Sequence, residues 1–153
     1  MRLIGSGTTA IEILLVEDSP GDARLTEEAL RDANTLVHLH VAADGVEAMA
    51  FLRRAPGHEH APRPHLILLD LNLPRMDGRE VLALIKEDDE LRTIPTIILT
   101  TSAAEADITK SYELQANCYL TKPVELDAFE SVVKSINDFW LTKVALPPQS
   151  HTG

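Results

Sequence analysis

The chain has 153 residues, of which 44% are hydrophobic, and 24 Asp and Glu against 14 Lys and Arg give it a formal charge of -10. This is the length of one ordinary domain with a real core, and the negative charge argues against direct binding to nucleic acid. We expect a cytoplasmic protein without membrane contact, because no apolar run approaches the roughly 18 residues of a membrane span and the N-terminus has no signal-peptide core.

Five short apolar runs alternate with five segments of helical periodicity, which predicts an α/β fold of (βα)5 type. The predicted strands are Ile11–Val16, Val37–Ala42, His65–Asp70, Thr96–Thr100 and Asn117–Thr121. The predicted helices are Pro20–Ala33, Asp44–Arg54, Asp77–Asp88, Ala103–Leu114 and Glu125–Leu141. This alternation favours a doubly wound parallel sheet with helices on both faces. We expect a flexible tail over residues 1–10, one domain over 11–141 and a C-terminal extension over 142–153.

Two further features have ordinary explanations. Cys118 is the one cysteine, so an internal disulfide is impossible, and its apolar strand predicts a buried thiol. The segment from Arg54 to Pro64 is rich in proline and glycine and is predicted to be a surface loop. Its two histidines, His58 and His60, lack a third ligand, so solvated side chains are favoured over a metal site.

Three predicted helices begin just beyond the ends of predicted strands. Ser19, Asp77 and Ser102 each occupy an N-cap position and are followed three residues later by an acidic residue. These motifs start helices, and their position after strands places three positive helix ends around one cleft. The arrangement favours an anion-binding site at this edge of the sheet.

Carboxylates are predicted to meet at the same edge. Glu17 and Asp18 follow the first strand, and Asp70 closes the third. Ligand chemistry gathers at the carboxyl ends of parallel strands, and converging carboxylates would repel one another without a hard divalent cation. We therefore predict a site for Mg²⁺ (or Mn²⁺) and phosphoryl chemistry, with Asp70 as nucleophile and Lys122 and Thr100 supplying charge and a hydroxyl.

These residues resemble the receiver domains of two-component response regulators over nearly the whole chain. The matching motifs are Leu15–Asp18, Leu69–Pro74 with Met76–Gly78, Leu99–Thr100 and Tyr119–Pro123. The resemblance implies a flavodoxin-like sheet of strand order 2-1-3-4-5 and a sensor histidine kinase as phosphodonor.

The resemblance also implies a role for each matching residue. Asp70 would be the phosphoacceptor, and the backbone carbonyl of Asn72 would join Glu17, Asp18 and Asp70 around the metal. Lys122 would pair with the phosphoryl group. Thr100 would move to hydrogen-bond that group, and Tyr119 would swing inward as the second half of the switch. Such a protein carries a phosphoryl group and is not a turnover enzyme.

Output would have to leave through the surface of this domain, which favours a homodimer formed by the last helix and the tail. The candidate interface residues are Val132, Phe139, Trp140, Leu141 and Leu146. The Phe139–Leu141 ending followed by Leu146 resembles the single-domain regulators paired with bacterial phytochromes. The kinase partner is therefore expected to be of phytochrome type.

Four alternatives stay open at this point. The neighbouring Thr101 could be the switch hydroxyl, although strand alternation favours Thr100. An aspartate-nucleophile phosphatase would use a general acid two residues after Asp70, where this chain has Asn72. A flavin-binding module would need a phosphate-cradling loop where Glu17 and Asp18 stand. A phosphorylation-independent adaptor would not need the complete set of motif residues.

Overall fold

The computed structural model describes residues 10–32, 36–100 and 118–121. Several predictions lie outside these ranges. They are the helices over 103–114 and 125–141, Asn117, Lys122, and the candidate interface residues Val132, Phe139, Trp140, Leu141 and Leu146. They stay predictions.

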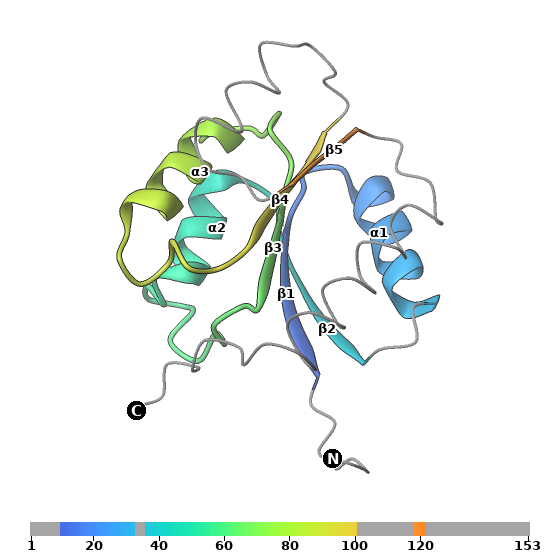
Figure 1. The fold of residues 1–153 in the computed structure, drawn as a ribbon, viewed down its shortest axis with the longest axis horizontal. Coiled ribbons are helices and arrows are strands. Elements are labelled where there is room, and N and C mark those ends of the chain that lie inside the picture. The colour runs from blue at the N-terminus through green and yellow to red at the C-terminus, as the bar shows by residue number, and fades with distance from the viewer. Residues whose placement is uncertain (1–9, 33–35, 101–117, 122–153) are drawn as a thin grey trace.

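Five parallel strands form one sheet in the order β2-β1-β3-β4-β5, as expected (Figure 1). The strands are β1 (Ile11–Val16), β2 (Val37–Ala42), β3 (Leu66–Leu69), β4 (Thr96–Thr100) and β5 (Cys118–Thr121). The predicted third strand was one residue too long at each end, so Asp70 follows β3 instead of closing it. Its N–H still donates to the carbonyl of Val16, at 3.0 Å, which fixes Asp70 beside the end of β1.

Three helices lie in the described ranges. They are α1 (Pro20–Asp32), α2 (Gly45–Leu52) and α3 (Gly78–Glu87). Helix α1 covers one face of the sheet, and α2 and α3 cover the other (Figure 1). None of these helices is long and apolar enough to cross a bilayer.

The second helix is shorter than the predicted Asp44–Arg54, for reasons visible at both ends. Asp44 is the N-cap, and its side chain accepts from the N–H of Glu47 at 2.8 Å. Arg53 is the C-cap, and Arg54 has a left-handed backbone with φ of 53°. The N–H groups of Arg54 and Ala55 donate back to Phe51 and Ala50, which is a Schellman ending.

The sheet separates two apolar layers. Leu14, Val16, Ile67 and Leu69 point toward α2 and α3, whereas Ile13, Leu15, Leu66 and Leu68 belong to the layer beneath α1. All four residues of β3 are fully buried, as the continuous apolar run predicts for a central strand. By contrast, β2 exposes His38 and Val41 and forms an edge of the sheet, which confirms its predicted position.

Candidate functional site

Three carboxylates meet at the carboxyl ends of β1 and β3. These strands are neighbours, with Val16 in register with Leu69, so the residues that follow them emerge side by side. One carboxylate oxygen from each of Glu17, Asp18 and Asp70 lies within 4.8 Å of the other two. The side chains of Glu17 and Asp70 are buried, at 4% and 5% exposure, whereas Asp18 is exposed. The structure thus brings together the acidic residues that the sequence places apart.

Backbone hydrogen bonds orient the two buried carboxylates. Oε2 of Glu17 accepts from the N–H of Ser19 at 3.2 Å, and Oδ1 of Asp70 accepts from the N–H of Asn72 at 3.0 Å. The N–H of Glu17 donates to Ala42 on the edge strand at 2.9 Å. Each carboxylate is therefore held by the turn that follows its own strand, and the sheet fixes the two turns relative to each other.

The donor set suits a divalent cation. Two buried carboxylates and one exposed carboxylate within 4.8 Å of one another repel strongly unless positive charge lies among them. All three ligands are hard oxygen atoms, which are the ligands that Mg²⁺ and similar ions prefer. The open side at Asp18 would leave room for water or a phosphoryl oxygen in the shell of a bound ion.

Helix α3 begins directly against the backbone of Asp70. Its N-cap, Asp77, accepts from the N–H of Arg79 at 3.0 Å, and the side chain of Glu80 accepts from the N–H of Asp77 at 3.1 Å. This confirms the predicted capping box. The next residue, Gly78, has no room for a side chain, because a Cβ there would collide with the carbonyl oxygen of Asp70. Gly78 thus permits the close approach that seats the helix end beside the acidic site.

A second contact holds the loop between β3 and α3 from the other side. Gly45, the first residue of α2, has no space for a Cβ because the carbonyl and Cβ of Met76 press against it. Arg75 has a left-handed backbone with φ of 70°, and its guanidinium lies 3.5 Å from the carboxylate of Asp44. The sequence analysis did not predict these contacts between α2 and the loop after β3. The glycines that directly follow Asp44 and Asp77 could have indicated them.

Of the other predicted site residues, the structure describes Thr100 and Tyr119. Thr100 ends β4 and is in register with Thr121, and Tyr119 on β5 is in register with Ile98. Both backbones therefore lie in the sheet on the side of β3 away from β1, with Thr100 at the carboxyl edge. Lys122 and Thr101 lie outside the described residues, so the choice between Thr100 and Thr101 as switch hydroxyl is left open. The third predicted capping serine, Ser102, lies outside them too.

Comparison with known proteins identifies the class. The model of the response regulator receiver domain family matches residues 13–134. The chain is 52% identical over 135 residues to the response regulator Rcp1 of Synechocystis sp., an alignment that covers 88% of this chain and 92% of Rcp1. The chain therefore belongs to the response regulator receiver domain family. Phosphorylation on an aspartate is the mechanism of this family.

Two solved structures are similar in fold as well as in sequence. The Mn²⁺-bound form of Rcp1 has a TM-score of 0.78 at 51% identity and covers 90% of this chain and 99% of its own. The phosphorylated cyanobacterial phytochrome response regulator RcpA has a TM-score of 0.80 at 48% identity. The alignment covers 92% of this chain and 100% of the RcpA chain. These two relatives were solved in a metal-bound and a phosphorylated state.

Proposed function

We propose that the chain is a response regulator that takes a phosphoryl group onto Asp70 from a phosphohistidine of a sensor kinase. An oxygen of Asp70 attacks the phosphorus, the phosphorus–nitrogen bond breaks, and the imidazole leaves with the bonding electrons while an acyl phosphate forms. The observation that carries the proposal is the buried Asp70 carboxylate, within 4.8 Å of Glu17 and Asp18 at the end of a central strand.

We assign Mg²⁺ (or Mn²⁺) as the ion of this site. Glu17, Asp18 and Asp70 would supply carboxylate oxygens, and Asn72 would supply its backbone carbonyl. The bound ion would neutralise charge that develops on the phosphoryl oxygens. The all-oxygen donor set supports this assignment, and so does the Mn²⁺-bound form of the similar Rcp1.

The readout of phosphorylation is assigned to Thr100, Tyr119 and Lys122. Lys122 would form an ion pair with the phosphoryl group. The hydroxyl of Thr100 would donate a hydrogen bond to that group, and Tyr119 would fill the space that Thr100 leaves. The position of Thr100 at the end of β4, beside β3, supports its part in this proposal. Replacing Thr100 by Ala is expected to weaken signalling while Asp70 still accepts phosphate.

The protein is proposed to carry a phosphoryl group and not to turn over a substrate. A phosphatase that uses an aspartate nucleophile needs a proton donor for its leaving group. Two residues after Asp70 stands Asn72, whose amide has no acidic proton at neutral pH. Stoichiometric labelling is therefore expected in place of steady release of phosphate.

The kinase partner is proposed to be of phytochrome type and the exchange to be cytoplasmic, where the ATP that charges a histidine kinase is found. The similarity to RcpA, a cyanobacterial phytochrome response regulator, supports this partner. We also propose that the last helix and tail form a homodimer. Size-exclusion chromatography with light scattering, with and without a small phosphoryl donor and Mg²⁺, tests the dimer, and a monomer in both states would contradict it.

Acetyl phosphate and Mg²⁺ provide the direct test of phosphorylation. Intact-mass measurement and phosphate-affinity electrophoresis should show one added phosphoryl group on the wild-type chain and none on Asp70→Asn. The matched control is Asp89→Asn, because that carboxylate is exposed and belongs to an i,i+3 ion pair away from the acidic site. Continued labelling of Asp70→Asn, or multiple turnover of a phosphomonoester by the wild-type protein, would overturn the proposal.

A further inference from the structure

Two histidines on the edge strand share one carboxylate of the neighbouring strand. Strands β1 and β2 are parallel, with Glu12 in register with His38. Nδ1 of His38 lies 3.0 Å from Oε2 of Glu12, and Nε2 of His40 lies 2.7 Å from Oε1. Side chains two residues apart on a strand point to the same face of the sheet. Glu12, His38 and His40 therefore form one group, which we call the histidine cluster.

The histidine cluster lies on the face of the sheet that α2 covers. Leu14, two residues after Glu12, belongs to the apolar layer on that face. The ring of His40 packs against that of Phe51 on α2, with the ring centroids 5.3 Å apart. Glu12 is the second residue of β1, whereas the acidic site begins just after the last residue of this strand. The cluster is thus separate from the acidic site and shares no residue with it.

Two members of the cluster are held in place, and the third is exposed. The backbone N–H of Glu12 donates to Nδ1 of His65 at 2.9 Å, and its carbonyl accepts from the N–H of His65 at 2.7 Å. The side chains of Glu12 and His40 are 19% and 30% exposed, whereas that of His38 is 58% exposed. The cluster therefore combines two ordered groups with one that can adjust to a ligand.

The carboxylate of the cluster is charged although it is largely buried. Burial by itself would raise the pKa of Glu12, but the hydrogen bonds from His40 and His38 bring this pKa below its usual 4.5. A negative charge at this position attracts cations, and the formal charge of -10 on the whole chain adds to the attraction. Imidazole nitrogens suit zinc, copper and nickel, whereas Mg²⁺ prefers oxygen ligands alone. The donor set of the cluster therefore differs in kind from that of the acidic site.

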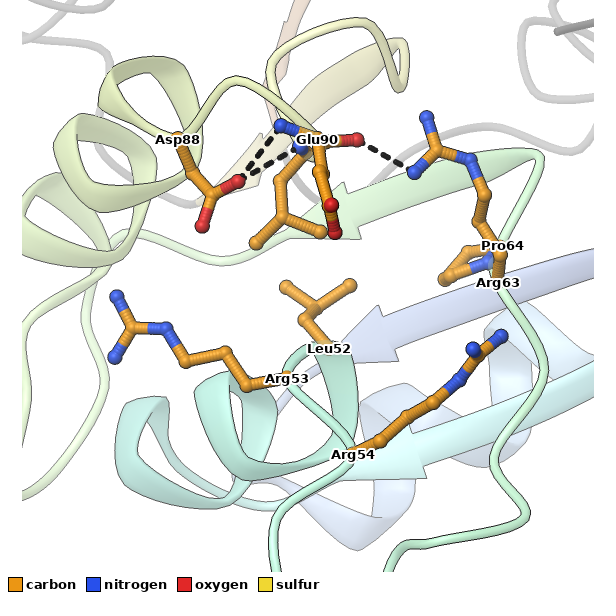
Figure 2. Close-up of a pocket in the computed structure, with 8 residues that line it drawn as sticks. Leu52, Arg53, Arg54, Arg63, Pro64, Asp88 and Glu90 are labelled. Atoms are coloured by element: carbon orange, nitrogen blue, oxygen red, sulfur yellow. Dashed lines mark hydrogen bonds between the residues drawn. The ribbon is translucent and has the colours of Figure 1, made fainter. Parts of the chain in front are cut away.

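A charged pocket of about 320 Å³ at the same end of the sheet offers no comparable donor set. Its lining includes Arg53, Arg54, Arg63, Asp88 and Glu90. Figure 2 shows the guanidinium groups of Arg53 and Arg54 pointing in opposite directions, and that of Arg63 on the side of Glu90. Charges of both signs are thus spread around the walls of this pocket. In the histidine cluster, by contrast, two imidazoles meet at one carboxylate.

We propose that the histidine cluster binds a divalent transition-metal ion, for which Zn²⁺ is the best match. The ligands are Nδ1 of His38, Nε2 of His40 and one carboxylate oxygen of Glu12, at about 2.0–2.2 Å from the ion. Each nitrogen lies on its own oxygen of the carboxylate, so the exposed side chain of His38 moves inward when the ion binds. Each imidazole then carries its proton on its other nitrogen, and water completes the tetrahedral shell. The bound ion joins the edge strand β2 to β1.

The test is calorimetric titration of the full chain, without an affinity tag, with Zn²⁺ in an excess of Mg²⁺. The excess of Mg²⁺ competes for sites made of oxygen atoms and leaves the imidazoles available to Zn²⁺. The wild-type chain should bind one Zn²⁺ at the cluster, and His38→Gln should raise the Kd by at least about tenfold. The side chain of His38 is mostly exposed, so this variant should fold, which thermal melting verifies.

Two further variants separate metal binding from a purely structural role. Glu12→Gln keeps an oxygen that accepts hydrogen bonds from both imidazoles but removes the charge, and it should also raise the Kd by at least about tenfold. His60→Gln is the matched control at an exposed loop histidine and should leave the Kd unchanged. In NMR spectra, one equivalent of Zn²⁺ should shift the ring signals of His38 and His40.

Three results would overturn the proposal. The first is a wild-type chain that binds no Zn²⁺ in the presence of Mg²⁺. The second is a Kd in His38→Gln or Glu12→Gln that equals the wild-type value, which would assign the bound Zn²⁺ to another site. The third is a His60→Gln variant that binds Zn²⁺ as weakly as His38→Gln does.

Discussion

The two ends of the sheet bring charged side chains together by different means. At the carboxyl end, Glu17, Asp18 and Asp70 follow adjacent strands within one or two residues. At the amino end, Arg53, Arg54 and Arg63 line one pocket with Asp88 and Glu90, because a long loop leaves α2 and turns back to enter β3. Strand order alone therefore determines the acidic site, whereas the pocket at the amino end depends on the path of a loop. Each end also contains an arginine with a left-handed backbone, Arg75 near the acidic site and Arg54 in the pocket.

The largest effect is expected from Gly78→Ala at the carboxyl end. The added Cβ would collide with the backbone of Asp70 and Leu71, so either α3 or the acceptor loop must move. We expect a loss of about 3 kcal/mol in the free energy of unfolding, measured by urea denaturation. Gly21→Ala is the control, since its nearest atom would be 4.0 Å away and alanine is the better helix former. Equal losses in the two variants would contradict the close-approach explanation.

Removal of one acidic charge should affect metal binding next. Asp18→Asn keeps the shape of the side chain but weakens the attraction for a cation, and we expect the Kd for Mn²⁺ to rise by at least about tenfold, or 1.4 kcal/mol. Without metal, the same variant should be slightly more stable, because three like charges become two. Titration calorimetry measures the first effect and thermal melting the second. Unchanged Mn²⁺ affinity would remove Asp18 from the site.

At the amino end, His65 should make stability depend on pH. Burial lowers the pKa of His65 from its usual 6.5, Arg63 adds to the lowering, and Glu12 opposes it. The unfolded chain therefore takes up a proton at higher pH than the folded chain does. The free energy of unfolding begins to fall below about pH 6.5, and the loss is complete once the pH is below the lowered pKa of the folded state. In His65→Gln the slope of the free energy of unfolding below pH 6.5 should be smaller. His60→Gln, at an exposed loop residue, should leave the slope unchanged.

The smallest effect is expected from Arg75→Gly. Glycine relieves the left-handed backbone, and the exposed ion pair with Asp44 at 3.5 Å contributes little, so stability should rise by about 0.5 kcal/mol. Arg24→Gly, in the interior of α1, is the contrasting control and should lower stability by about 1 kcal/mol. Urea denaturation of both variants gives the comparison. A loss of stability in Arg75→Gly would mean that its side chain, and not its backbone, determines its contribution to the loop.

Sequence reasoning predicted the strands well because buried parallel strands leave a strong apolar pattern. All four residues of β3 are apolar and fully buried, and the error there was a single residue at each end. The end of α2 was missed because Arg53 and Arg54 are acceptable helix residues by local preference. Backbone hydrogen bonds to Ala50 and Phe51 end the helix there, whereas Pro56 and Gly57 indicate only that the helix ends before residue 55.

The sequence pattern by itself determined the order of the strands and of the three described helices, and it placed the group of carboxylates at the carboxyl edge of the sheet, while the strand order came from the resemblance to receiver domains. This was possible because a residue that directly follows a buried strand has its position set by that strand. Only the tertiary structure decided how Gly78 and Gly45 admit neighbouring backbone, and how Arg63 comes to lie opposite Arg53 and Arg54. These contacts join segments far apart in the chain, and their geometry depends on loop paths that local preferences do not specify.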